Sequence, residues 1–210
     1  MVLAVVAGVL AAAYLWHWLD QREQAKQRPL LKALAERLHF EREPGQAQED
    51  TFKTLHQGWL LSLGMRQNLM SGRMNCLRPT LHLDLGLALP QRFEAIPTAW
   101  GWEFGTSDQS RVFKTRNAAL DLYFVWMCAR EEQPRAQEVL GRNPAVQRAL
   151  TALSEGSSAF VRIEKNQVSL IFARTPDEAA LRGDMEALTA LAKALSVAFA
   201  PVRDEVRRNA

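Results

Sequence analysis

TLHLDLGLAL, from Thr80 to Leu89, alternates leucine with other residues at every second position. Successive side chains of a β-strand point to opposite faces, so the five leucines would share one face and His82 and Asp84 the other. The pattern predicts a half-buried strand whose leucine face packs on a core and whose polar face is solvated.

Other strand signals lie on both sides of this stretch. Ala159–Glu164 and Gln167–Ala173 alternate in the same way around Lys165-Asn166, which predicts a β-hairpin. Leu120–Cys128 is rich in aromatic and β-branched residues and is expected to form a central strand. Arg111–Lys114 is expected to form a short strand, whereas Phe52–Leu69 mixes helical and strand spacing and its type stays open.

Helix signals occupy the second half of the chain. Pro134 is expected to start a helix that stops at Gly141, and Asn143 to cap a second helix that ends near Gly156. Thr175 to Glu178 has the form of a capping box before a long terminal helix, whose start Gly183 is expected to offset to near Asp184. Strands followed by helices, with no βαβ alternation, predict an α+β fold with a mainly antiparallel sheet and a packed C-terminal helix.

The amino terminus carries a second strong pattern. Val2 to Leu19 reads VLAVVAGVLAAAYLWHWL and holds no charged residue. As a helix it would be about 27 Å long, which is enough to cross the hydrocarbon core of a bilayer. A cleaved signal peptide would begin with a basic segment, which this chain lacks, so a single transmembrane anchor over residues 1–20 is predicted.

Aromatic and basic residues follow the apolar run. The aromatic side chains prefer the membrane–water boundary, and those expected there are Tyr14, Trp16 and Trp18. Basic residues then gather on the carboxyl-terminal side of the run, at Arg22, Lys26, Arg28, Lys32 and Arg37. By the positive-inside rule, the amino terminus lies outside and the following domain lies in the cytoplasm, which in a Gram-negative cell means the inner membrane.

Small residues share one face of this helix. Ala4, Gly8 and Ala12 are spaced by four, a pattern that lets a second helix approach closely within lipid. The alternative is an anchor whose whole surface faces lipid.

The rest of the chain divides into two parts. Residues 21–51 are expected to form an amphipathic helix beginning at Pro29, followed by a polar linker, and residues 52–210 form the soluble domain. Hydrophobic residues make up 48% of the sequence and charged residues 23%, so this part should fold rather than remain disordered. The 26 basic and 23 acidic residues are interspersed, which argues against nucleic-acid binding.

No catalytic, cofactor or metal motif is recognised. His82 and Asp84 share a strand face but lack a third ligand. Asp121 is expected to cap a neighbouring turn or bind Arg116, and Cys76 and Cys128 to be buried free thiols. Trp100 and Trp102, in a loop near proline, are candidate protein contacts because aromatic residues are favoured at interfaces.

One pattern resembles a known layout. Thr115-Arg116-Asn117 followed by Asp121-Leu122-Tyr123-Phe124, then two short helices, a hairpin and a final helix, is similar to uncharacterised bacterial membrane-anchored proteins of unknown function. Arg116 stands where that layout more often has glycine. The resemblance implies a cytoplasmic domain beside a membrane anchor, and no activity.

The sequence supports three hypotheses of function. The first is a non-enzymatic accessory or assembly subunit of a larger inner-membrane complex, whose partners are membrane lipid and integral membrane proteins, with no cofactor. The second is a membrane-tethered sensor or small-ligand-binding domain with a pocket between the sheet and the terminal helix. The third is an unrecognised hydrolase that depends on His82 or Asp121.

Overall fold

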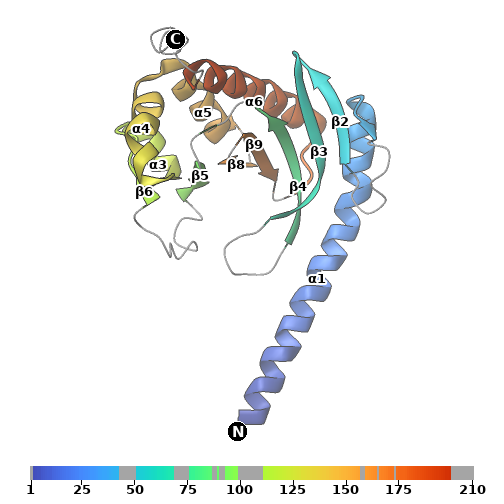
Figure 1. The fold of residues 1–210 in the computed structure, drawn as a ribbon. Coiled ribbons are helices and arrows are strands. Elements are labelled where there is room, and N and C mark those ends of the chain that lie inside the picture. Colours follow the sequence, from blue (N-terminus) through green and yellow to red (C-terminus); the bar gives the residue numbers. More distant parts are fainter. Residues whose placement is uncertain are drawn as a thin grey trace, which may run out of the picture.

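The computed structural model describes residues 2–42, 51–68, 76–86, 89, 93–98, 111–156, 159–164, 166–172 and 174–199. It is an α+β fold built on two antiparallel sheets (Figure 1). The predicted α+β class with a mainly antiparallel sheet is therefore confirmed, with helices packed on the sheet and a long helix at the carboxyl-terminal end. The transmembrane helix expected before this domain is not shown and stays a prediction.

The larger sheet has the strand order β1-β2-β3-β4-β9-β8, and every neighbouring pair is antiparallel. Its strands are β1 (Glu41–Arg42), β2 (Thr51–His56), β3 (Trp59–Asn68), β4 (Cys76–Asp84), β8 (Ala159–Glu164) and β9 (Gln167–Phe172). The sequence left the secondary structure of Phe52–Leu69 undecided; in the structure β2 and β3 form a hairpin there. Its turn residues Gln57 and Gly58 have φ angles of 51° and 83°. Such left-handed turns match the twist of the strands they join.

The smaller sheet has the order β5-β7-β6, from β5 (Glu94–Pro97), β7 (Phe124–Met127) and β6 (Val112–Phe113). It adjoins the larger sheet, because β5 packs against β8. The strand expected at Arg111–Lys114 is present but shorter.

The helices are α1 (Val2–Arg37), α3 (Ala118–Tyr123), α4 (Gln133–Arg142), α5 (Pro144–Gly156) and α6 (Glu178–Ala198), with a 3₁₀ turn at Arg130–Glu132. Helix α6 lies against β4, β9 and α5, and the carboxyl-terminal part of α1 contacts β3 and β4. The amino-terminal part of α1 stands clear of the domain (Figure 1).

The core lies between the leucine face of the larger sheet and these helices. Across the sheet, Phe52, Leu63, Leu81, Leu170 and Val161 are register partners, and all are buried. Burying such side chains contributes about 1.5–3 kcal/mol each relative to leaving them in water. The leucine face predicted from Thr80–Leu89 is confirmed for Leu81, Leu83, Leu85 and Leu89.

Two predicted boundaries are wrong at strand β7. Leu120–Cys128 was expected to be one strand, but Ala118–Tyr123 is a helix and only Phe124–Met127 is extended. The cause is local: the Asn117 side chain accepts hydrogen bonds from the backbone N–H groups of Ala119 and Leu120, which caps a short helix. This cap outweighs the strand propensity of the first residues.

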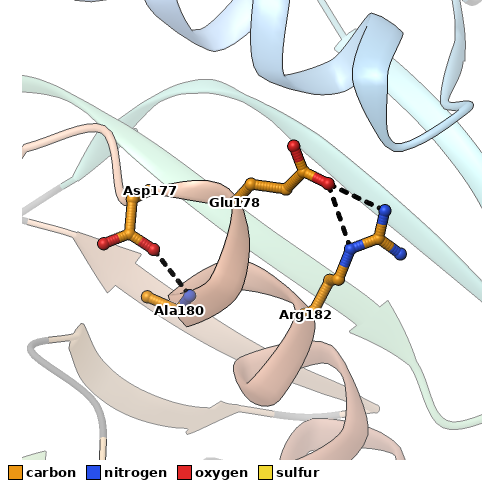
Figure 2. A network of polar contacts seen from close by, with 4 residues as sticks. All are labelled: Asp177, Glu178, Ala180 and Arg182. Atoms are coloured by element: carbon orange, nitrogen blue, oxygen red, sulfur yellow. Dashed lines mark hydrogen bonds and ion pairs between the residues drawn. The ribbon is translucent and has the colours of Figure 1, made fainter.

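Two helix starts also differ from prediction. Pro29 does not begin a helix but lies inside α1, which is continuous from Val2 to Arg37. Helix α6 starts at Glu178 rather than near Asp184, because its cap is Asp177, whose carboxylate accepts a 2.8 Å hydrogen bond from the Ala180 N–H. Figure 2 shows this cap beside the Glu178–Arg182 ion pair, 2.9 Å long, which joins the first two turns of α6.

Candidate functional site

The projecting part of α1 exposes large apolar side chains. Tyr14 is 74% exposed, and Leu15, Trp18 and Leu19 are also exposed. Exposed apolar side chains that gather on one element make it a candidate contact surface.

In the part of the chain that the structure describes, no helix combines the length and the apolar character needed to cross a membrane.

A basic collar follows the aromatic residues. Its members are exposed along α1, before and within the part of the helix that packs on the domain: Arg22, Lys26, Arg28, Lys32 and Arg37. The Arg22 guanidinium lies 5.5 Å from the centre of the Trp18 ring, a cation–π arrangement. Lys26 pairs with Glu23 at 3.5 Å, and a hydrogen bond from Gln27 together with Lys26 lowers the pKa of that carboxyl.

The far end of α1 is fixed to the domain by apolar packing. Leu31, Leu34, Ala35 and Leu38 are buried on one face of the helix and join the core of the sheet. Their spacing of three and four is that of a helical stripe. The amphipathic helix predicted after the anchor is therefore present, but as a direct continuation of the same helix.

A polar contact completes this junction. Gln27 is 8% exposed, and its side-chain oxygen accepts hydrogen bonds from the Thr175 N–H at 2.7 Å and from the Thr175 hydroxyl at 2.6 Å. Its side-chain N–H donates to Glu23 at 3.2 Å. Sequence reasoning missed Gln27; the available signal was that it continues the Leu31–Leu34–Leu38 stripe one turn upstream.

The predicted site residues of the anchor all lie on α1. Gly8 and the aromatic residues Tyr14 and Trp18 are exposed. The side chains of Ala4, Ala12 and Trp16 are outside the description, although their backbone is helical. Trp100 and Trp102 lie outside the described residues altogether.

His82 occupies the polar face of β4, but the expectation that this face is solvated is wrong for His82, which is 8% exposed. Its Nδ1 lies 3.3 Å from the Ser169 hydroxyl on β9. Burial, with Arg66 nearby, lowers the pKa of the His82 imidazole to about 4. A neutral imidazole is thus favoured at neutral pH.

Asp84 is turned toward the β-turns rather than toward His82. Its carboxylate accepts hydrogen bonds from the Gly86 N–H at 2.9 Å and from the Asn166 side chain at 3.1 Å. Ser169 thus lies beside the His82 imidazole, but the contacts of the Asp84 carboxylate are with Gly86 and Asn166 and do not orient that imidazole, as a catalytic acid would. Among the described residues, no group of three or more His, Cys, Asp or Glu side chains is arranged to hold a metal ion.

The other two candidate residues have structural positions. The Asp121 carboxylate accepts hydrogen bonds from the Thr115 N–H and hydroxyl, each 2.9 Å long, and so holds the turn before α3 as expected. Cys128 is a buried free thiol, and burial raises its pKa to about 11. The Cys76 side chain is not described.

The structure has two surface pockets near these residues and the α1 junction. One, of about 470 Å³, lies between the turn at Thr115 and Arg116 and helix α4, where Arg142 lines it. The other, of about 340 Å³, lies at the junction itself, between Leu30, Ala33 and Arg37 of α1 and the Thr175–Glu178 segment that leads into α6.

The sequence matches no protein-family model and no curated protein. The crystal structure of the mycobacterial trehalose monomycolate transport factor A, TtfA, is similar in fold. The two align with a TM-score of 0.53 over 86% of this chain and 98% of that chain, with 9% of residues identical. At this identity the likeness shows a shared fold alone.

Proposed function

We propose that this protein is a non-enzymatic accessory or assembly subunit of a larger complex in the bacterial inner membrane. The observation that carries the proposal is the continuity of α1. One helix runs from an exposed apolar end, through a basic collar, to a face buried in the α+β domain. Such a helix transmits the position of a membrane partner directly to the domain.

In this proposal residues 2–19 cross the bilayer and residues 22–37 form its cytoplasmic border. The uncharged run is long enough to span the hydrocarbon core. Exposed aromatic side chains stand at its end and basic side chains come after it, which is the order found at a cytoplasmic boundary. The domain then lies in the cytoplasm, and its partners are membrane lipid and integral membrane proteins.

The shared fold with TtfA favours one process for this role. TtfA is named as a transport factor, and its chain aligns over nearly its whole length with this one. An accessory role in membrane transport is therefore the process we propose. The distance in sequence leaves the transported substance open.

Small-ligand binding is a second candidate, favoured by the pocket beside Arg116 and Arg142. Its volume of about 470 Å³ falls in the range of known ligand pockets, roughly 300–1,000 Å³. A ligand-dependent rise in the melting temperature, abolished by Arg142→Ala, would favour this candidate over the first.

The anchor is tested by membrane extraction of the full-length protein and of a variant that lacks residues 2–19. We expect the full chain to stay in membranes at alkaline pH, where peripheral proteins dissociate, and the shortened chain to be released. A cysteine-specific probe should label an added cysteine after Arg37 only from the cytoplasmic side. Release of the full chain by alkali would contradict the proposal.

A further inference from the structure

We infer that the domain itself touches the membrane, at the end of the larger sheet where β3 leads to β4, and that Arg66 and Arg78 there bind the phosphates of anionic lipid headgroups. The inference rests on the proposed function, because it needs α1 to cross the bilayer. It adds a second membrane contact, which fixes the tilt of the domain on its anchor. The two residues are called the arginine pair below.

The arginine pair lies on the polar face of the larger sheet, opposite to the leucine core. Arg66 of β3 and Arg78 of β4 are register partners, and both side chains are partly exposed. Two like charges placed directly opposite one another on neighbouring strands destabilise a sheet. An anion bound by both guanidinium groups relieves this repulsion, and the planar guanidinium matches the geometry of a phosphate.

The strands that carry the pair belong to a segment without acidic residues. Between residues 51 and 83 the sequence contains no aspartate or glutamate. The basic residues of the segment are Lys53, Arg66, Arg73 and Arg78. A second copy of this chain that met the first at this end would add like charges rather than opposite ones. The complementary surface is therefore a negative one, as anionic lipid provides.

Strand β4 carries opposite charges at its two ends. Its final residue is Asp84, which lies six residues and about 20 Å from Arg78. Between them His82 responds to the positive end, since burial first and then the charge of Arg66 lower the pKa of its imidazole to about 4. A negative membrane surface thus attracts one end of this strand and repels the other.

The positive end is the one nearer the membrane in the proposed arrangement. Because β4 and β9 are antiparallel, the start of β4 lies beside the end of β9, which leads to Thr175. The Thr175 N–H and hydroxyl donate hydrogen bonds to the Gln27 side chain of α1. Arg78, near the start of β4, is therefore at the end of the sheet that adjoins Gln27. Figure 1 shows the joined ends of β3 and β4 on the side of the domain toward the amino-terminal end of α1.

The distance from this end of the sheet to the lipid is short. Gln27 follows Leu19, the end of the apolar run, by eight residues, which is about 12 Å of helix. The headgroup layer fills about 5–7 Å of that distance, and a long arginine side chain covers much of the remainder. The attraction also acts over about 8 Å, the screening length at physiological ionic strength. The arginine pair therefore lies within reach of the headgroups.

The experiment is lipid photo-labelling of the full-length protein in nanodiscs. One set of discs contains phosphatidylglycerol mixed with phosphatidylcholine and the other phosphatidylcholine alone, each with a trace of its own lipid carrying a photoreactive headgroup. Label on α1 serves as the internal reference, because the anchor meets both kinds of lipid. Relative to α1, we expect the joined ends of β3 and β4 to be labelled about 25-fold more with phosphatidylglycerol. Each arginine near an anionic surface favours the docked state about fivefold.

A matched pair of variants tests the two residues. Arg66→Gln with Arg78→Gln should lower the labelling of these strand ends by the same factor. Arg142→Gln with Arg148→Gln removes the same charge from exposed positions on α4 and α5, on the far side of the domain from the amino-terminal end of α1 (Figure 1), and should leave the labelling unchanged. The comparison of the two lipids needs no substitution, so the test holds even if a variant fails to fold.

Three results would overturn the inference. They are equal labelling of the strand ends in the two kinds of disc, no label on them with phosphatidylglycerol, and undiminished labelling of the folded Arg66→Gln, Arg78→Gln variant. If α1 is labelled in these cases, only the inference fails and the anchor stands. The absence of label from α1 as well would contradict the proposed function too.

Discussion

Two glycines in helices have opposite surroundings. A side chain on Gly141 of α4 would overlap the backbone carbonyl oxygen of Thr115, whereas nothing lies near Gly183 of α6. We expect Gly141→Ala to lower the free energy of unfolding by about 1–3 kcal/mol through overpacking. Gly183→Ala should raise it by about 0.5–1 kcal/mol, because alanine favours the helix. Denaturant unfolding of the full-length protein in detergent measures both, and equal signs would contradict the assigned contact.

His82 predicts a pH dependence of stability. Its pKa is lowered to about 4 in the folded protein from about 6.5 when unfolded, so the unfolded chain binds the extra proton between these values. The contribution is complete above about pH 6.5 and is lost as pH falls toward 4. Its size is on the order of 3 kcal/mol. His82→Asn should flatten this part of the curve of unfolding free energy against pH.

The matched control for that curve is His39→Asn. The His39 side chain is exposed, and asparagine tolerates its φ angle of 57°. The control should keep the slope of the unmodified protein. An unchanged slope in the His82 variant would show that the imidazole is not held neutral by burial.

At the residue scale, sequence reasoning succeeded where a side chain acts on its neighbours. The turn-holding role of Asp121 and the cap at Asn143, whose side chain accepts from the N–H groups of Ala145 and Val146, follow from local chemistry. Arg116 stands at a position that favours glycine, and its φ angle is 66°. The burial of His82 was missed, because strand alternation separates the two faces of a sheet without showing which of them is covered.

The junction between α1 and α6 depends on Gln27 and Thr175. Thr175→Val removes the hydroxyl that donates to the Gln27 side chain while keeping the shape of residue 175. We expect a loss of about 1–2 kcal/mol in stability, since a buried amide oxygen loses a partner. Hydrogen exchange should show faster opening of α1 around residues 27–38.

Thr54→Val, on β2, makes the same chemical change outside the Gln27–Thr175 contact. It should leave exchange in α1 unaltered. If both variants open α1 equally, the Gln27–Thr175 contact does not hold the helix on the domain.

At the element scale, the errors have two causes. The helix at Ala118–Tyr123 and the start of α6 follow from local caps at Asn117 and Asp177. The extent of α1 through Pro29 depends instead on its packing against the domain. Proline inside a helix costs about 3 kcal/mol, and here the buried leucines that follow it offset that cost. The hairpin at 159–172 was predicted correctly because its pattern and turn lie within one short segment.

For the whole molecule, the α+β class followed from the order of strand and helix signals, whereas the strand order did not. Pairing of β4 with β9 joins residues such as Leu81 and Leu170, far apart in the chain. No local pattern encodes that choice. A membrane anchor at α1 stays a prediction, whereas the continuation of this helix into the core of the domain was seen only in the structure.

The most direct test of the proposed subunit role is to extract the full-length protein from its native membranes in mild detergent and measure the mass at which it migrates. We predict comigration with a complex several times its own mass of 23.7 kDa, containing integral membrane proteins. The complex should weaken when Gly8 is replaced by a bulky residue. Migration at the mass of a monomer or dimer would contradict the account.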